Sequence, residues 1–354
     1  MAYSYPLLKK ISSYYRKIPH EVGETYLVCC QHLLEPQKYM FEELITFGFD
    51  PNKIFVLGKT YSTSTEILEE LQALKIRAVQ PPFSGVAFDQ EHAKNCSELM
   101  NMIPQGASCI LLDDGAQLIQ MSMSGDKNIL FAVEQTSSGF RKLENIALPF
   151  PVLNVARSAT KLLQESPLIA RHACDRIKEY FEDRNLLKPT ILIVGLGPIG
   201  ESVRECLEQD GYTVSGFDIK HGHSDLMREI TTQEVDVIIG ATGTQILAAK
   251  DIETLPSHKS LHLISMSSSD REFAVAPFRN GNTATHVDIV YKSVTFVNNA
   301  FPISFKGNRY ESLPIEMEKT MCLLGGAVMY GATANTLENG LIPLPEELED
   351  LTNP

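Results

Sequence analysis

Short apolar runs alternate with amphipathic stretches over the first 155 residues of the chain. The apolar runs have strand length and are rich in valine, isoleucine and leucine, and the stretches between them carry apolar residues at the spacing of a helix face. This alternation is typical of a parallel, doubly wound sheet. We predict strands at 25–30, 53–58, 76–80, 109–114, 128–134 and 151–156. We predict helices near 36–47, 64–74, 90–102 and 137–145.

A long helical stretch, 157–184, separates this region from a second set of strands. Those strands begin at Ile191 and continue at 213–217, 235–243, 261–267 and 294–299. The pattern from 315 to 337 is helical again, and we expect this tail to return to the first domain. A chain of 354 residues has room for two domain cores. The sequence therefore predicts an α/β protein with two doubly wound parallel sheets, divided into a first domain, 1–185 completed by 305–354, and a second, 186–304.

Glycines at a strand-to-helix junction give the strongest functional signal. The run ILIVGLGPIGESV, residues 191–203, is an apolar strand that leads through three glycines into a helical pattern. In a Rossmann turn Gly195 would permit the tight turn, Gly197 would let a pyrophosphate approach the backbone, and Gly200 would let the helix pack on the strand. The free amides of the first helical turn would face the phosphates. The alternative is a glycine-rich turn in an ordinary α/β domain.

An acid follows the next strand at the spacing that NAD recognition requires. Asp218 ends the strand 213–217, about 20 residues beyond the glycines, where a carboxylate can accept hydrogen bonds from ribose hydroxyls. Because this charge would repel a 2′-phosphate, we predict NAD as the cofactor. The neighbouring Lys220 and His221 keep NADP open as an alternative.

The composition and the sequence argue against two classes of partner, nucleic acids and membranes. The net charge of −13 disfavours nucleic-acid binding, which depends on Lys and Arg. No apolar stretch is long enough to span a bilayer, and the amino terminus lacks the apolar core of a signal peptide, so we expect no membrane partner. Seven cysteines without CxxC spacing indicate reduced thiols and a cytoplasmic location. His221 and His223 are too few ligands for a metal, and no metal site is predicted.

Polar residues follow the ends of the first-domain strands, where ligands bind in sheets of this kind. They are His32, Ser62, Thr63, Asp113, Asp114, residues 134–138 and Lys161. Ser62 and Thr63 could instead cap the helix that begins near Thr65. The residues alone predict an NAD-dependent redox site for an unspecified substrate.

Five motifs occur together in the order of a known enzyme family. QHLLEP, TYSTSTE, LLDDGA, VEQTSSGF and LNVARSATK precede the glycine turn, and the chain resembles S-adenosyl-L-homocysteine hydrolase (adenosylhomocysteinase) over about residues 25 to 300. The resemblance implies an enzyme with tightly bound NAD. Such an enzyme oxidises a ribose carbon, eliminates the thiol, adds water and reduces the sugar again.

The resemblance also assigns roles to individual residues. His32 would transfer the proton of the attacking water and of the leaving group, and Asp114 would act as a base. Lys161 would activate the hydroxyl that is oxidised, and Glu165, one turn further on, is also assigned to the catalytic residues. Substrate binding is assigned to Ser62, Glu134, Gln135 and Thr136. NAD binding is assigned to Gly195, Gly197, Pro198, Ile199, Gly200, Asp218, Ala241, Thr242, Gly243 and Asn298.

Several residues depart from the family pattern. Gln135 stands where the family has a ribose-binding glutamate, Glu165 replaces an aspartate, and Leu34 replaces a threonine that contacts the base. The strand 261–267 is not followed by the family's histidine, and the basic carboxyl tail is missing. These departures fall on adenosine recognition, so the expected substrate is a ribosyl thioether or a related nucleoside or sugar.

Two further functions remain open. A catalytically impaired relative would bind NAD or a nucleoside and regulate or scaffold a partner, whereas a plain dehydrogenase would release NADH. In each case the expected partner is a small molecule, and a homo-oligomer, either a dimer or a tetramer, is expected.

Overall fold

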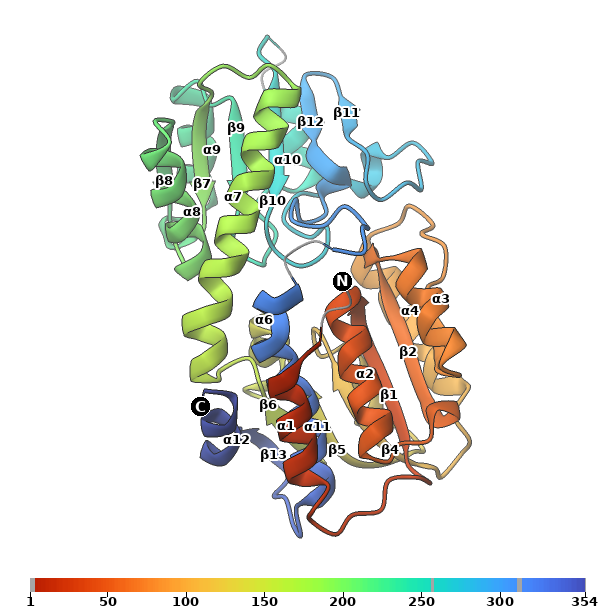
Figure 1. The fold of residues 1–354 in the computed structure, drawn as a ribbon. Coiled ribbons are helices and arrows are strands. Elements are labelled where there is room, and N and C mark those ends of the chain that lie inside the picture. The colour runs from red at the N-terminus through yellow and green to blue at the C-terminus, as the bar shows by residue number, and fades with distance from the viewer. Residues whose placement is uncertain (1–3, 256–257, 311–313, 354) are drawn as a thin grey trace. The chain divides into compact units, whose positions relative to one another are not determined.

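The chain divides into two compact units, each built around its own sheet. In the computed structural model, which describes residues 4–255, 258–310 and 314–353, the first unit comprises residues 1–81, 92–165 and 307–354. The second comprises residues 82–91 and 166–306. Both are α/β layers in which helices cover a mostly parallel sheet, as the sequence predicts (Figure 1).

The first unit holds a seven-stranded sheet in the order β13-β6-β5-β4-β1-β2-β3, with every neighbouring pair parallel. The strands are β1 (Tyr26–Leu33), β2 (Ile54–Thr63), β3 (Arg77–Val79), β4 (Ser108–Asp113), β5 (Asn128–Glu134), β6 (Pro151–Asn154) and β13 (Gly340–Pro343). The strand order reverses between β1 and β4, so loops from their carboxyl ends leave in opposite directions. A doubly wound sheet binds its ligands at such a point.

Alternating side chains along the strands build a separate core on each face of this sheet. In β1, Leu27 and Cys29 face one layer of helices, whereas Val28 and Cys30 face the other. The first layer comprises α1 (Pro6–Tyr15), α2 (Glu35–Phe47), α3 (Thr65–Ala73), α11 (Glu318–Thr333) and α12 (Glu346–Thr352). The second comprises α4 (Phe88–Asn101), α5 (Gln117–Ser122) and α6 (Ser137–Leu143).

The second unit holds a six-stranded sheet in the order β11-β12-β10-β9-β7-β8. The strands are β7 (Thr190–Val194), β8 (Thr213–Phe217), β9 (Val237–Gly240), β10 (Leu261–Ser265), β11 (Ile289–Tyr291) and β12 (Val294–Phe296). All pairs are parallel except β11 with β12. The order reverses between β7 and β9, which places the end of β7 at this sheet's switch point.

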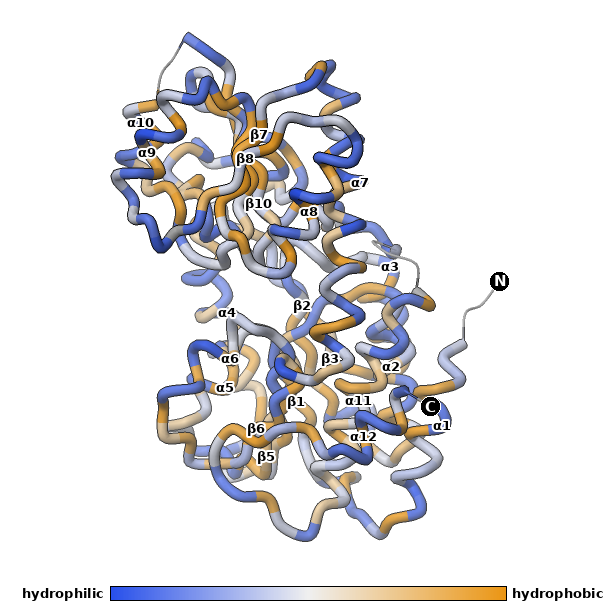
Figure 2. The backbone as a smooth tube through the Cα atoms, turned by 90° about the vertical axis from the view of Figure 1, so that its left-hand side faces the viewer, coloured by the Kyte–Doolittle hydropathy of each residue, from blue (hydrophilic) through white to orange (hydrophobic). Residues whose placement is uncertain are grey.

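Helices cover both faces of the second sheet. α7 (Ser166–Asp183) and α8 (Pro198–Gln209) pack on one face, and α9 (His223–Thr232) and α10 (Ala249–Thr254) on the other. In Figure 2 the strongly apolar stretches gather on sheet strands such as β7. No helix in the described part of the chain is both long and apolar enough to cross a membrane.

The units differ from the expected domain boundaries at three places, one of which is only the shift of residues 305–306 into the second unit. Residues 166–185 belong to the second unit because α7 buries Ala170, Ile177 and Phe181 on that unit's sheet. Residues 82–91 also belong to the second unit, since the buried Arg279 donates to the carbonyl oxygens of Gly85 and Val86.

The prediction that all cysteines are reduced is wrong for one pair. Cys174 of α7 and Cys206 of α8 form a disulfide, because the packing of these two helices brings the thiols together although they stand 32 residues apart. The other five cysteines are free and buried, including Cys29 and Cys30.

Several elements begin or end away from their predicted bounds. The predicted helix 157–184 consists of a π-helical turn, η2 (Lys161–Glu165), followed by α7. The predicted strand 294–299 ends at Phe296 and gives way to a 3-10 turn in which Asn298 and Asn299 have positive φ. The sequence pattern did not predict α1, α5, α9, α10, β11, β13 or α12.

Candidate functional site

A bulge in β2 brings polar side chains to the switch point of the first sheet. β1 pairs Gln31 with Gly58 and Leu33 with Thr63, so residues 59–62 stand opposite His32 alone. The hydroxyl of Thr63 closes the bulge by donating to the carbonyl of Lys59 at 2.8 Å. Neither Ser62 nor Thr63 caps α3, whose N-cap is Ser64. The bulge redirects side chains, and two of them reach the predicted site.

Asp114, directly after β4, is the centre of this cluster. Its Oδ1 is ion-paired with the ammonium of Lys59, and its Oδ2 lies 3.1 Å from Nε2 of His32. Gln135, at the end of β5, donates from Nε2 to the same Oδ2 at 2.9 Å. The Asp114 and Lys59 side chains are 1% and 3% exposed, so this is a buried ion pair with a histidine at its accessible edge.

Charges within the cluster fix its protonation. Burial alone would raise the pKa of Asp114, but Lys59 and His32 hold it well below its usual range. Burial alone would lower the pKa of Lys59, but Asp114 raises it. Burial lowers the pKa of His32, the charge and hydrogen bond of Asp114 oppose this, and the charges of Lys59 and Lys161 add to the lowering, so that the net shift is downward. The cluster is therefore an aspartate, an ammonium and a neutral imidazole at neutral pH.

These charges also determine the tautomer of His32. Because Asp114 can only accept, a neutral His32 carries its hydrogen on Nε2, and Nδ1 then accepts from the Ser62 hydroxyl at 2.5 Å. Ser62 is fully buried, so it orients the ring and is not placed to attack a substrate. The His32 side chain is 15% exposed, whereas Asp114 and Ser62 are buried, so His32 is the one of these three residues that solvent reaches.

Lys161 stands on the π-helical turn η2, close enough for its charge to act on His32. Its ammonium lies 3.3 Å from Oε2 of Glu165, one turn further on. The Thr320 hydroxyl of α11 donates to the same Oε2 at 2.8 Å and fixes the carboxylate. The structure thus joins His32 and Asp114, which the sequence motifs identified, to Lys59, which they missed, whereas Lys161 acts on His32 by its charge and contacts Glu165.

Glu134 is held by its own backbone environment. Its carboxylate is fully buried and accepts from the amides of Gly115, Ala116 and Thr136 and from the Thr136 hydroxyl. Burial raises its pKa to about 8, and the charge of Asp113 adds to the shift. Thr136 is also the N-cap of α6, accepting from the amide of Gly139. These contacts give both residues a structural role, and their assigned substrate contacts stay predictions.

Two buried acceptors beside this cluster lack a partner in the described part of the chain. They are Oε1 of Gln135 and Oδ1 of Asn154, at the ends of β5 and β6. A buried carbonyl oxygen without a hydrogen bond is costly, so both atoms suit a ligand that donates hydroxyl hydrogens.

The glycine-rich turn of the second unit has the close contacts that require glycine. Gly195 has φ +104, and a Cβ there would lie 2.8 Å from the carbonyl of Ala241. A Cβ on Gly200 would lie 2.0 Å from the Gly195 oxygen. By contrast, nothing lies within 4 Å of the corresponding position on Gly197, which is exposed at the N-cap of α8 just before Pro198 and Ile199. The turn is therefore closely packed at Gly195 and Gly200 but open at Gly197, and this shape fits a pyrophosphate at the open position.

A buried glutamate holds the neighbouring loop. Glu272 is fully buried, and its Oε1 accepts from the amides of Thr242 and Gly243 and from the Ser267 hydroxyl. Its Oε2 accepts from the Ser265 hydroxyl at 2.8 Å. Glu272 thus joins the loops after β9 and β10, a role that the sequence did not reveal because SSSDRE has no periodic pattern.

Asp218 and Asn298 complete the predicted cofactor residues. Asp218 is partly exposed at the end of β8, where its Oδ1 accepts from the Lys220 amide and its Oδ2 lies 3.5 Å from the Lys220 ammonium. Asn298 has φ 53 and donates to the carbonyls of Pro302 and Phe305. Asn298 shapes its own loop by these bonds, and its contact with a cofactor stays a prediction.

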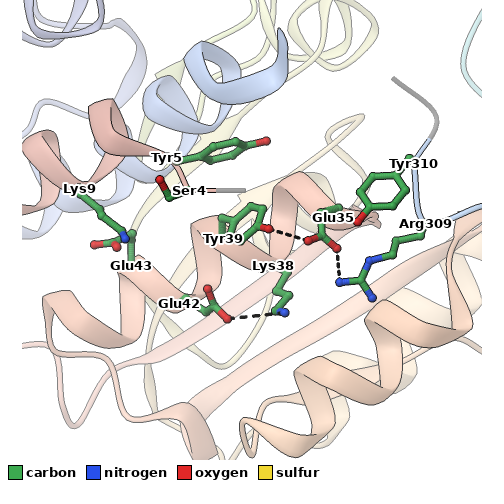
Figure 3. Close-up of a pocket in the computed structure, with 10 residues that line it drawn as sticks. All are labelled: Ser4, Tyr5, Lys9, Glu35, Lys38, Tyr39, Glu42, Glu43, Arg309 and Tyr310. Atoms are coloured by element: carbon green, nitrogen blue, oxygen red, sulfur yellow. Dashed lines mark hydrogen bonds and ion pairs between the residues drawn. The ribbon is translucent and has the colours of Figure 1, made fainter. Parts of the chain in front are cut away.

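A hollow of about 390 Å³ lies elsewhere in the first unit. Figure 3 shows Glu35 between Tyr39, whose hydroxyl donates to it at 2.6 Å, and Arg309, which is ion-paired with it. Its lining residues are Ser4, Tyr5, Lys9, Glu35, Lys38, Tyr39, Glu42, Glu43, Arg309 and Tyr310. Opposite charges alternate around it and largely pair with one another, so the hollow does not select one sign of ligand.

Comparisons with known proteins include a sequence relative that covers most of the chain. No family model matches the chain. An uncharacterized protein of Mycobacterium tuberculosis, found in two strains, is 33% identical over 332 residues, which cover 87% of this chain. The chain spans 64% of the length of these curated relatives.

Similar solved structures include three that cover most of the chain. A 3-phosphoglycerate dehydrogenase of Entamoeba histolytica is 11% identical with a TM-score of 0.40, covering 89% of this chain and 98% of that one. A D-isomer specific 2-hydroxyacid dehydrogenase of Lactobacillus delbrueckii is 11% identical with a TM-score of 0.33, covering 88% and 100%. A dipicolinate synthase polypeptide of Bacillus halodurans is 12% identical with a TM-score of 0.36, covering 69% and 83%. TM-scores this low carry no argument about function.

Proposed function

We propose that the chain is an NAD-dependent, adenosylhomocysteinase-like enzyme. It would cleave a ribosyl thioether, or a related nucleoside or sugar, by transient oxidation, elimination, water addition and re-reduction. The observation that carries this proposal is the contact of His32 with Asp114 at one sheet's switch point, with the charge of Lys161 acting on His32, in a chain whose other sheet has an open glycine turn at its own switch point.

The second unit would bind NAD. Its residues fit the cofactor, because the tight contacts behind Gly195 and Gly200 leave the backbone at Gly197 open to a pyrophosphate. Glu272 would hold Thr242 and Gly243 in place beside the turn. Bound NAD would supply a reversible oxidant for a sugar hydroxyl.

The first unit would hold the substrate and move its protons. His32, the accessible member of the cluster, would exchange a proton with water or the leaving group through Nδ1, once this nitrogen gives up its hydrogen bond with the Ser62 hydroxyl. Asp114 would orient this ring, because its low pKa makes it a weak base. Lys161 would favour loss of the proton from the hydroxyl that is oxidised. Gln135 and Asn154 would accept hydrogen bonds from the substrate's hydroxyls.

The purified full chain tests this proposal directly. We expect it to carry NAD, and its absorbance should show reduction of NAD when S-adenosylhomocysteine, adenosine or a related ribosyl compound is added. Lys161→Ala and Asp114→Asn should each lower turnover by about 10²–10⁴-fold. Lys94→Ala, which changes an ammonium whose side chain is 75% exposed, is the matched control and should keep turnover. Wild-type turnover in both site variants would refute the mechanism.

One observation favours a second function. Both oxygens of Asp114 are already engaged, Oδ1 by Lys59 and Oδ2 by His32 and Gln135, and a carboxylate held in this way is less able to act as the base that turnover would need. A catalytically impaired relative would bind NAD or a nucleoside tightly in calorimetry and convert none of the ribosyl compounds. Steady accumulation of free NADH would instead identify a plain dehydrogenase. The cytoplasmic location and the dimer or tetramer stay predictions.

A further inference from the structure

We propose that the first unit contains a structural zinc site formed by Cys30, His92 and Cys96, with the neighbouring Asp113 as the candidate fourth ligand. This proposal goes beyond the proposed function and does not depend on it. The four residues come from three elements, β1, α4 and β4, and Cys30 stands 66 residues before Cys96, so no local motif announces the site.

Two of the three pairs among Cys30, Cys96 and His92 have the separation that a tetrahedral zinc ion needs. Cys30 Sγ and Cys96 Sγ are 3.4 Å apart, and Cys96 Sγ lies 3.7 Å from Nε2 of His92. One ligand atom from each of the three lies within 4.8 Å of the other two. Zinc bonds of about 2.3 Å to sulfur and about 2.0 Å to nitrogen place two tetrahedral ligands about 3.5–3.8 Å apart. The observed distances fall close to this interval.

The backbone supports this arrangement. His92 and Cys96 are four residues apart on α4, so one helix face presents both ligands to the sheet. The side chain of Cys30 on β1 lies on the face of the sheet that α4 covers. All three are buried, and a buried thiol, thiol and imidazole at one point are unusual as plain core residues.

Asp113 supplies the second, independent observation. It is fully buried, and its Oδ2 accepts from the Ile119 amide at 2.9 Å. Its Oδ1 is buried and has no hydrogen-bond partner among the described residues. Asp113 directly follows Leu112, which pairs with Cys29, and its charge acts on Cys30, Cys96 and His92. Its carboxylate is not among the atoms that lie within 4.8 Å of one another, so it would turn toward the ion to become the fourth ligand, and the metal would complete the bonding of its free oxygen.

Charge and ligand type select zinc. Two thiolates, one neutral imidazole and one carboxylate match the sulfur, nitrogen and oxygen ligands of a closed tetrahedral site, and both thiols release their protons on binding. The site would carry one excess negative charge, and the ammonium of Lys59 acts on both Cys30 and Cys96. A disulfide between Cys30 and Cys96 would not account for the positions of His92 and Asp113.

Metal analysis of the full chain, purified under reducing conditions, tests the site. We expect about one zinc ion per chain in the wild type, and its loss from Cys30→Ser and Cys96→Ser. Cys322→Ser, which changes a free buried cysteine in α11, is the matched control and should retain the zinc. Zinc that remains bound in the Cys30→Ser/Cys96→Ser double variant would overturn the proposal.

A second measurement on the wild type covers the case in which the variants fail to fold. After removal of metal by a chelator, added zinc should raise the midpoint of thermal unfolding, whereas added magnesium should not. Cobalt in place of zinc should give the intense absorption of a tetrahedral thiolate complex. An unchanged midpoint and no cobalt spectrum would overturn the proposal, as would a Cys30–Cys96 disulfide found by mass spectrometry in the reduced preparation.

Discussion

Both carboxylate oxygens of Asp114 are engaged inside the protein, Oδ1 by the ammonium of Lys59 and Oδ2 by His32 and Gln135. Such a buried pair costs solvation energy, which mutual attraction only partly offsets. Its value lies in the geometry that it fixes, since the aspartate determines which ring nitrogen of His32 carries the hydrogen.

Removing the ammonium from this pair is therefore expected to be severe. Lys59→Met would leave Asp114 buried with one fewer counter-charge, and we expect a loss of about 3–5 kcal/mol in the free energy of unfolding. Urea unfolding followed by circular dichroism measures this loss. Lys94→Met, on the exposed face of α4, is the control and should change stability little.

A double-mutant cycle isolates the pair itself. In an Asp114→Asn background, Lys59→Met should cost much less, because no buried negative charge is left unpaired. Equal costs in both backgrounds would show that Lys59 stabilises the protein by packing alone.

At the residue scale, the sequence identified the candidate reactive side chains better than the residues that hold them in place. His32, Asp114 and Lys161 follow predicted strands and stand in recognisable motifs. Lys59 does not, because a lysine near the end of a strand is usually solvated, and the bulge that buries it depends on the pairing of β1 with β2. Glu272 was missed for a similar reason, since its hydrogen-bonding partners come from the ends of two separate strands, β9 and β10.

At the scale of elements, strands with steady apolar runs were the most predictable. The bounds of β5 and β8 agree with the prediction, because both runs stop at acidic or polar residues. β13 was not identified, since GLIP has only two strongly apolar residues and becomes a strand by pairing with β6. β11 depends in the same way on its antiparallel pairing with β12.

The glycine turn allows fold and binding to be separated. Gly197→Ala should fold normally, because its φ of −84 suits alanine and no atom lies nearby, but it should lose NAD affinity by about tenfold or more if a pyrophosphate sits there. Calorimetric titration with NAD measures this change.

Gly200→Ala is the contrasting variant. Its Cβ would meet the Gly195 oxygen at 2.0 Å, so we expect a lower thermal midpoint as well as lost binding. Undiminished NAD affinity in Gly197→Ala would argue against the turn as the phosphate site.

At the scale of the whole molecule, each unit has cores on both faces of its own sheet. The segment 307–354 supplies α11, β13 and α12 to the first unit, with Leu348 fully buried against Gly326. The first unit is therefore complete only when the chain has returned to it from the second.

Leu348→Ala tests this dependence. The cavity left beside α11 should cost about 2–5 kcal/mol, and it should lower the unfolding transition of the first unit. Leu187→Ala, at a side chain that is 91% exposed, is the control and should leave the calorimetric profile unchanged. A wild-type profile in Leu348→Ala would mean that α12 contributes nothing to that core.

The contacts of segment 82–91 limit how the coding sequence of the second unit can be moved by recombination. Arg279 is buried with Asp270 and also holds two carbonyl oxygens from this segment, while Phe83 and Phe88 cover Phe301. The continuous stretch 166–306 transplanted into another gene would leave this guanidinium two acceptors short and one aromatic face bare. Recombination that moves the second unit as a working module must therefore carry two separate pieces of coding sequence, a demand that favours inheritance of both units together.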